Sequence, residues 1–118
     1  MAVEQLIGYQ KAFYFFIWQK SVIGHLAKVH KYSLGIQIEN EALELIKNIV
    51  IANLARVNKS RKIEKCLVDV EILKVFFRVG HELNRDGGVS LKQYEMASEK
   101  LVELGNLCGG WLGKFQSG

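Results

Sequence analysis

Four basic residues of this sequence follow one another at a spacing that places them on one side of a helix. They are Lys74, Arg78, His81 and Arg85, separated by steps of four, three and four. Residues three and four apart are neighbours on a helix surface, so these side chains form a ridge that could contact successive phosphates of a nucleic acid. A solvated helix face that pairs with Glu71 and Glu82 is the other interpretation of this pattern.

A second group of basic residues surrounds a predicted turn in the middle of the chain. Its members are Arg56, Lys59, Arg61, Lys62 and Lys65. A helix that begins here would add the positive end of its dipole to these charges, which favours contact with an anion. Turns are also often basic for solubility alone, and the sequence does not separate the two interpretations.

No arrangement of residues typical of catalysis or metal binding occurs in the sequence. His25, His30 and His81 lie on separate segments, and there is no Glu-x-x-His pair of the kind used in di-iron bundles. Neither a phosphate-binding Gly-rich loop nor a Gly-x-Ser-x-Gly motif is found. Cys66 and Cys108 form no disulfide framework or zinc pattern and are expected to be buried. We therefore expect a non-enzymatic protein without catalytic residues, metal or cofactor.

The elements that position these side chains are predicted to be four helices. Proline is absent, and turn-forming residues gather at three places, residues 30–35, 58–60 and 84–88. Between them apolar residues recur at steps of three and four, which predicts helices over residues 9–29, 37–57, 61–84 and 90–115. Short connections between long helices make neighbours antiparallel, so the expected fold is one all-α domain, an up-and-down four-helix bundle.

Two serines are expected to cap the last two helices. Ser60 precedes Glu64 and the apolar series of the third helix, and Ser90 precedes Gln93 at the spacing of a capping box. In that motif the serine hydroxyl accepts a hydrogen bond from the backbone three residues on, and the Gln side chain accepts one from the serine N–H. Both helices should begin directly after these serines.

The apolar surface of the first three helices is wider than a solitary bundle needs. On the second helix, for example, two rows of apolar residues cover more than half of the circumference, whereas one stripe is enough to face a core. Contacts between subunits would cover the surplus, so we expect a homo-oligomer. The alternative is a thick aromatic core within one subunit.

Small and aromatic residues near the C-terminus suggest a packing surface. Gly105, Gly109 and Gly113 recur at four-residue steps beside Trp111, a pattern that lets another backbone approach closely. A frayed helix end is the alternative, since each interior glycine costs about 1 kcal/mol of helix stability. Trp18 on the first helix belongs to the same group of candidate packing residues.

Charge and hydropathy favour an intracellular protein and allow acidic partners. The chain has 118 residues and a net charge of +4, and its longest apolar run, residues 13–18, is far shorter than the roughly 20 residues that span a bilayer. The first residues, Met1–Glu4, lack the basic region and cleavage site of a secretory signal. We expect a cytoplasmic location and no membrane contact, and the basic excess is compatible both with acidic partners and with ordinary solvated lysines.

The stretch Leu104–Leu112, with the sequence LGNLCGGWL, resembles the Gly-Gly-Trp ending of the accessory variability determinant (Avd) proteins of diversity-generating retroelements. Leu73–Arg78 is similar to the Leu-Arg-x-x-x-Arg helix of that family. Tyr32–Gly35 is similar to a turn shared with the wider group of four-helix bundle proteins encoded within 23S ribosomal RNA intervening sequences. The likeness covers most of the chain.

This resemblance implies a homopentameric barrel of bundles that binds the reverse transcriptase of the element and its template RNA or DNA. Such proteins support mutagenic retrohoming without being catalysts. The basic helix positions of the family fall on Lys74 and Arg78; Lys74 replaces an arginine, which turns a bidentate phosphate contact into a point-charge contact. The alternative is an oligomeric bundle of the intervening-sequence group, with no polymerase partner.

Overall fold

Four long helices make up almost the whole chain. The structure, a computed structural model, describes residues 3–116 and the side chains of residues 7–115. The long helices are α1 (Val3–His25), α3 (Leu34–Leu54), α4 (Lys59–Glu82) and α5 (Leu91–Gln116). Two short elements lie between them, α2 (Lys28–Lys31) and the 3₁₀-helix η1 (Asn84–Asp86). No strand occurs in residues 3–116, and the all-helical prediction is confirmed.

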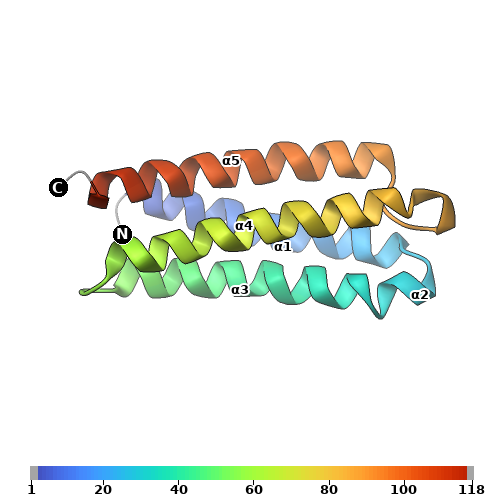
Figure 1. Cartoon of the computed structure of the whole chain (residues 1–118), viewed down its shortest axis with the longest axis horizontal. Helices are drawn as coiled ribbons and strands as arrows, with labels where there is room; N and C mark the ends of the chain where they lie inside the picture. The colour runs from blue at the N-terminus through green and yellow to red at the C-terminus, as the bar shows by residue number, and fades with distance from the viewer. Residues whose placement is uncertain (1–2, 117–118) are drawn as a thin grey trace.

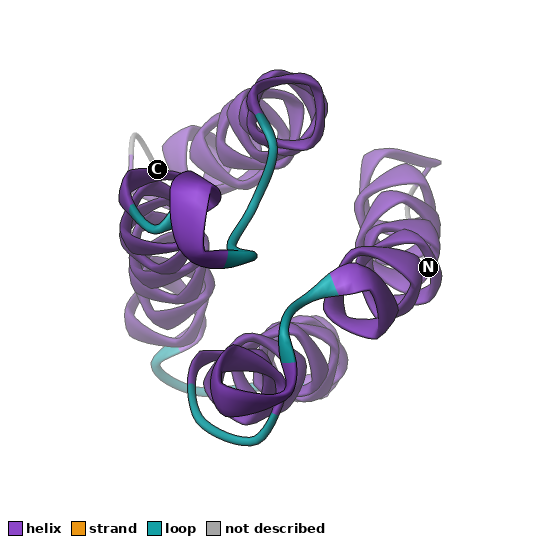
Figure 2. Cartoon of the chain, turned by 90° about the vertical axis from the view of Figure 1, so that its right-hand side faces the viewer, coloured by secondary structure: helices purple, strands orange, loops and turns teal. Residues whose placement is uncertain are grey.

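The four long helices lie side by side as an elongated bundle of 48 × 21 × 19 Å (Figure 1). Each packs against the next one along the chain in antiparallel orientation, and α5 returns to contact α1 (Figure 2). None of the described helices combines the length and apolar character needed to cross a membrane. Met1 and Ala2, part of the segment inspected for a secretory signal, lie outside the described residues.

The predicted first helix, residues 9–29, is wrong at both ends. α1 begins at Val3 and ends at His25. Ala27 leaves the helical conformation, with ψ at 149°, and its N–H donates to the carbonyl of Gly87 at 2.8 Å. Gly87, at a φ of 83°, belongs to the α4–α5 connection, so a long-range contact ends α1. The other three predicted helices agree to within three residues at each end.

The cap predicted for the last helix is confirmed, whereas the one predicted for α4 is wrong. The Gln93 N–H donates to Ser90 Oγ at 3.1 Å, and the Ser90 N–H donates to Gln93 Oε1 at 3.0 Å. At α4, the helix begins one residue before Ser60, and Asn58 occupies the cap position with a left-handed φ of 56°. The Ser60 hydroxyl instead donates to the backbone carbonyl of Phe115 at 3.3 Å, which ties the start of α4 to the end of α5.

Each long helix buries one apolar stripe in a continuous core. The largest fully buried side chains include Phe15, Leu45, Leu73, Phe77 and Leu101, one or more from every long helix. The rings of Phe15 and Phe77 meet edge to face, with their centroids 5.9 Å apart. Burial of a side chain of this size contributes about 1.5–3 kcal/mol, so this shared core holds the four helices in fixed positions.

Both cysteines lie in this core and are free thiols. Burial raises the pKa of Cys66 to about 12 and that of Cys108 to about 11. Because the thiolate is the reactive form, both side chains remain protonated and unreactive at neutral pH. They act as small apolar residues, as the sequence predicts.

A polar cluster interrupts the core between α3 and α4. The Asn48 amide donates to Asp69 Oδ2 at 2.6 Å, and Asp69 is only 3% exposed. Glu41, two turns before Asn48, has a buried Oε1 for which the described residues provide no donor. Burial is the main effect that raises the pKa of Glu41 from 4.5 to about 7. The hydrogen bond with Asp69 and the negative charge of Asp69 contribute to the same rise. Near neutral pH, Glu41 is therefore still partly protonated beside Asp69.

We predict that the bundle loses stability as the pH rises through neutrality. The pKa of Glu41 is higher in the folded state than its ordinary 4.5, so its contribution is complete below that value and is lost as the pH rises through about 7. The free energy of unfolding should fall by about 2 kcal/mol between about pH 5 and about pH 8. Urea unfolding at a series of pH values measures this change.

The Glu41→Gln variant, which carries no titrating proton, should flatten this pH dependence. Glu99→Gln is the matched control, because Glu99 is exposed on α5 and its removal should leave the profile unchanged. A wild-type profile that is flat over this range would show that the fold does not raise the pKa of Glu41.

Candidate nucleic-acid interface

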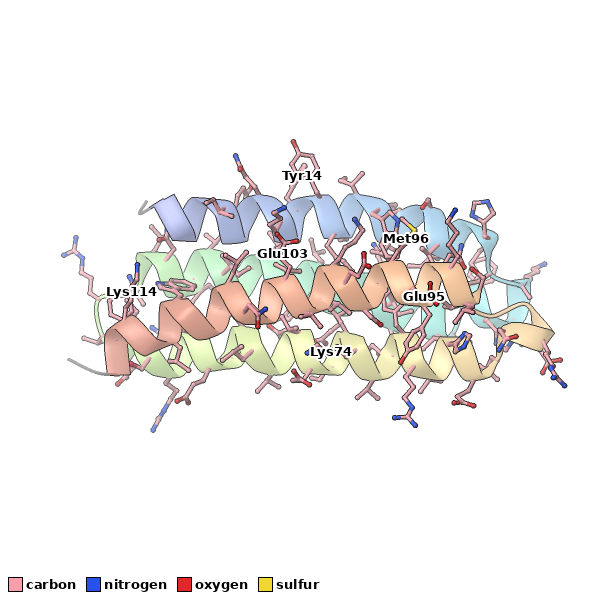
Figure 3. All side chains as sticks on the ribbon, turned by 90° about the horizontal axis from the view of Figure 1, so that it is seen from above. Tyr14, Lys74, Glu95, Met96, Glu103 and Lys114 are labelled. Atoms are coloured by element: carbon pink, nitrogen blue, oxygen red, sulfur yellow. The ribbon has the colours of Figure 1, made fainter. Side chains whose placement is uncertain are left out.

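The predicted basic ridge lies along α4 where it faces α5, and it extends into η1. Lys74, Arg78 and His81 belong to α4, and Arg85 belongs to η1. Lys74 sits midway along the bundle (Figure 3), half-buried beside α5, and its Nζ donates to the Glu71 carboxylate at 3.0 Å. Arg78 and Arg85 are exposed. The ridge therefore keeps two exposed arginines, while its lysine already has an ionic partner.

His81 connects α4 to α5 in the structure. Its ring stacks on Tyr94 of α5 with the centroids 4.8 Å apart and the planes 4° from parallel. Its Nδ1 lies 3.2 Å from the carbonyl oxygen of Val89, in hydrogen-bond contact. A half-buried ring with both contacts is fixed in place, so its role on the ridge is packing. The helical spacing of the sequence gives no sign of this cross-helix stack.

The charges along the ridge are balanced. Glu71, Glu82 and Asp86 lie among its three permanently charged residues, Lys74, Arg78 and Arg85. Since attraction of a polyanion depends on the summed charge of a surface, alternating charges produce only a weak field. The pairing with Glu71 that the sequence offered as an alternative is present in the structure.

The second predicted cluster is gathered at one end of the bundle, which we call the basic end. It comprises Arg56, Lys59, Arg61, Lys62 and Lys65, from the α3–α4 connection and the first two turns of α4. Arg56, Arg61 and Lys65 are exposed, and Lys59 and Lys62 are half-buried. Figure 1 shows this connection at the same end as the C-terminal turn of α5, where Figure 3 shows Lys114.

The basic end accounts for the net charge of the protein. Residues 56–65 contain five basic residues and one acidic residue, Glu64, which gives a net charge of +4. This equals the net charge of the complete chain, so the remaining residues are balanced. The charge of Lys65 also acts on the buried cluster of Asn48, Asp69 and Glu41, where it lowers the pKa of Glu41 and so opposes the larger effect of burial. The electrostatic attraction for a polyanion is therefore concentrated at one end of the bundle.

A shallow hollow of about 510 Å³ lies within the basic end. It is lined by Asn58, Lys59, Ser60, Arg61, Glu64 and Phe115. Lys59 Nζ donates to the carbonyl of Asn53 at 3.0 Å and lies over the Phe115 ring, 5.3 Å from its centroid. The sequence assigns Phe115 only to the apolar series of the last helix, because nothing local indicates that the C-terminal turn reaches the α3–α4 connection.

The two candidate packing tryptophans lie inside the subunit. The Trp18 ring stacks against Phe77 with a centroid distance of 6.1 Å, and Lys100 Nζ lies 5.4 Å from the Trp18 centroid. Trp111 is 6% exposed. Both side chains therefore pack within the bundle and offer little surface to another chain.

The three candidate packing glycines differ in their surroundings. At Gly105 an added Cβ would lie 3.7 Å from Val70, an ordinary contact distance between α5 and α4. At Gly109 and Gly113 it would meet no described atom within 4 Å. Among the described residues, the close backbone approach that this spacing predicts is therefore not made.

Exposed apolar side chains lie on two other parts of the bundle. On α4 they include Val68, Val75 and Val79, of which the first two line a groove of about 450 Å³ together with Leu67, Ile72 and Phe76. On α1 and α3 they include Phe13, Ile17, Ile36 and Leu43. The wide apolar circumference noted in the sequence is thus only partly used by the core.

Comparison with known protein families matches residues 6–115 of the chain to the bAvd-like family. The chain belongs to the bAvd-like family. No curated protein and no solved structure matches it. The match to the bAvd-like family spans the four long helices, the ridge and the basic end, and it confirms the family resemblance that the Gly-Gly-Trp ending and the α4 motif indicate.

Proposed function

We propose that this bAvd-like protein is the non-catalytic accessory subunit of a diversity-generating retroelement. It binds the template RNA or DNA of the element and its reverse transcriptase, and so supports mutagenic retrohoming in the cytoplasm. Family membership supports this role. The observation that carries the proposal is the concentration of the whole net charge at one end of the bundle. The alternative without a polymerase partner has no comparable support, because the matched family is the Avd-like one.

Phosphate contact at the basic end is the binding mechanism that we propose. The exposed Arg56 and Arg61 and the half-buried Lys62 form no ion pair with a carboxylate among the described side chains, so their charges are available to a polyanion. Each phosphate neutralised by such a residue releases a condensed counterion, which makes the affinity fall steeply with salt. The exposed Arg78 and Arg85 of the ridge would add secondary contacts. Binding of this kind is largely independent of base sequence.

Self-assembly is the second part of the proposal. The apolar face of α4 and that of α1 and α3 are different surfaces of one chain. Pairing of two different surfaces between copies is a heterologous contact, which forms a closed ring when the rotation between neighbours closes. The family resemblance implies a ring of five. Such an assembly would cover the exposed apolar residues and repeat the basic end around one rim.

We predict that removing three charges from the basic end weakens nucleic-acid binding more than removing three from the ridge. The variant pair is R56A/R61A/K62A against K74A/R78A/R85A, which lower the net charge equally. Fluorescence anisotropy with a labelled RNA over a salt series gives both affinity and salt slope. The first variant should lose about two units of slope, as expected for three phosphate contacts, and bind on the order of 100-fold more weakly near 0.1 M salt.

The equal charge change in the two variants separates local contacts from overall attraction. Equal losses of affinity in the two variants would mean that nucleic acid does not recognise the basic end in particular. A larger loss of affinity in the ridge variant would place the binding site on the ridge. Affinity that is flat between low and moderate salt would contradict the phosphate mechanism itself. Co-purification with a co-expressed reverse transcriptase of a diversity-generating retroelement tests the second partner.

We predict that the purified protein is oligomeric and that a charge on the α4 face dissociates it. Val75 and Val102 are both exposed valines in the middle of long helices, at 58% and 50%, but Val75 lines the α4 groove and Val102 does not. Light scattering should give a multiple of 13.4 kDa for the wild type and for Val102→Glu. Val75→Glu should lower the measured molar mass toward that of the monomer, because burial of the added charge in an interface is unfavourable. A strictly monomeric and folded wild type would refute the assembly.

A further inference from the structure

We infer that the basic end selects single-stranded RNA or DNA by stacking an unpaired base on Phe115. This inference rests on the proposed nucleic-acid binding and makes it specific to a strand type and a residue. Proteins that bind single strands combine a cationic path for the backbone with aromatic rings on which bases stack. The hollow at the basic end brings both components together.

The Phe115 ring is accessible and also held in place. Its side chain is 42% exposed, although it lies on the same helix as the buried apolar stripe of α5. The backbone carbonyl of Phe115 accepts a hydrogen bond from Ser60 Oγ at 3.3 Å, and Lys59 Nζ lies 5.3 Å from the ring centroid. Lys59 is itself anchored to the carbonyl of Asn53 at 3.0 Å. Two contacts from the start of α4 thus present the ring at the edge of the hollow, and little ordering is left for binding.

Polar groups around the ring suit the edges and the backbone of a nucleotide. Arg61 lines the hollow and is exposed, and Lys62 and Arg56 belong to the same end of the bundle. The Asn58 side chain makes no cap hydrogen bond to α4 and lines the same hollow. An amide of this kind can both donate to and accept from the edge of a base. A base on Phe115 would therefore have cations for its phosphate and an amide for its edge.

A paired base cannot use this site, because its faces are already stacked inside the duplex. Duplex could bind only through its phosphates, at the surrounding cations. A membrane is a different partner that would also suit basic residues beside the exposed Leu54 and Val57. The hollow is lined mainly by polar side chains, which suits a nucleotide better than the apolar interior of a lipid surface.

The test compares Phe115→Ala with the wild type on two probes, an unstructured oligouridine of about 12 nucleotides and a hairpin duplex of similar charge. By anisotropy, the variant should bind the single strand about ten-fold more weakly, the loss expected from one base–aromatic stack. Its affinity for the duplex should stay within about two-fold. Phe115→Trp should restore single-strand binding, and circular dichroism checks that each variant is folded.

Phe13→Ala is the matched control, because Phe13 is 41% exposed but lies on α1 and does not line the hollow. It should leave both affinities unchanged. A 2-aminopurine base in the single strand should lose fluorescence on binding the wild type but not Phe115→Ala, since stacking quenches it. That optical signal responds to base stacking and not to charge.

Three results would overturn the inference. If Phe115→Ala weakens binding to both probes equally, or to neither, the ring does not select single strands, while the charge variants still decide whether the basic end binds phosphate. If anionic phosphatidylserine vesicles bind the wild type, lose affinity for Phe115→Ala and compete with oligouridine, the end is a lipid surface. If the wild type binds no nucleic acid at all, the proposed function fails together with the inference.

Discussion

The packing of α4 against both α3 and α5 fixes the positions on which every functional surface of this protein depends. α4 buries residues from Ile63 to Gly80 along its length, and it is the element that carries the ridge, most of the basic end and the apolar groove. At one end Val89 N–H bonds to the carbonyl of Gly80 at 2.8 Å. At the other, Ser60 bonds to the end of α5. A helix held at one end by the α4–α5 connection, at the other by α5 and along its length by the core can present charges in fixed positions.

That arrangement concentrates like charges where neighbouring carboxylates do not balance them. Mutual repulsion among five cations opposes folding, and the shared core must offset it. Along the ridge, by contrast, the charges are balanced, because Glu71, Glu82 and Asp86 lie among its cations. This contrast is the reason that we propose different roles for two clusters with similar sequence signals, long-range attraction of polyanions at the basic end and only secondary contacts along the ridge. The uncovered valines of α4 are suited to contacts with another protein chain.

Patterns within one segment predicted most of the fold, and contacts between segments account for what they missed. The Ser90–Gln93 cap and the approximate bounds of α3, α4 and α5 depend on local spacing, and the sequence located these bounds to within three residues. The end of α1 depends on the bond between Ala27 and Gly87, and the role of His81 depends on Tyr94. Phe115 belongs to the hollow only because the helices are antiparallel and similar in length. The raised pKa of Glu41 likewise requires α3 and α4 to be placed side by side, because Asp69 is one of its causes.

The central claim is that nucleic acid binds at the basic end. Hydrogen–deuterium exchange of the protein with and without saturating RNA tests this claim most directly, because it locates the protected amides along the chain. Protection should be concentrated in the α3–α4 connection, the first turns of α4 and the last turn of α5, with little change along residues 74–85. Protection centred on the ridge, with none at residues 55–65, would contradict the account.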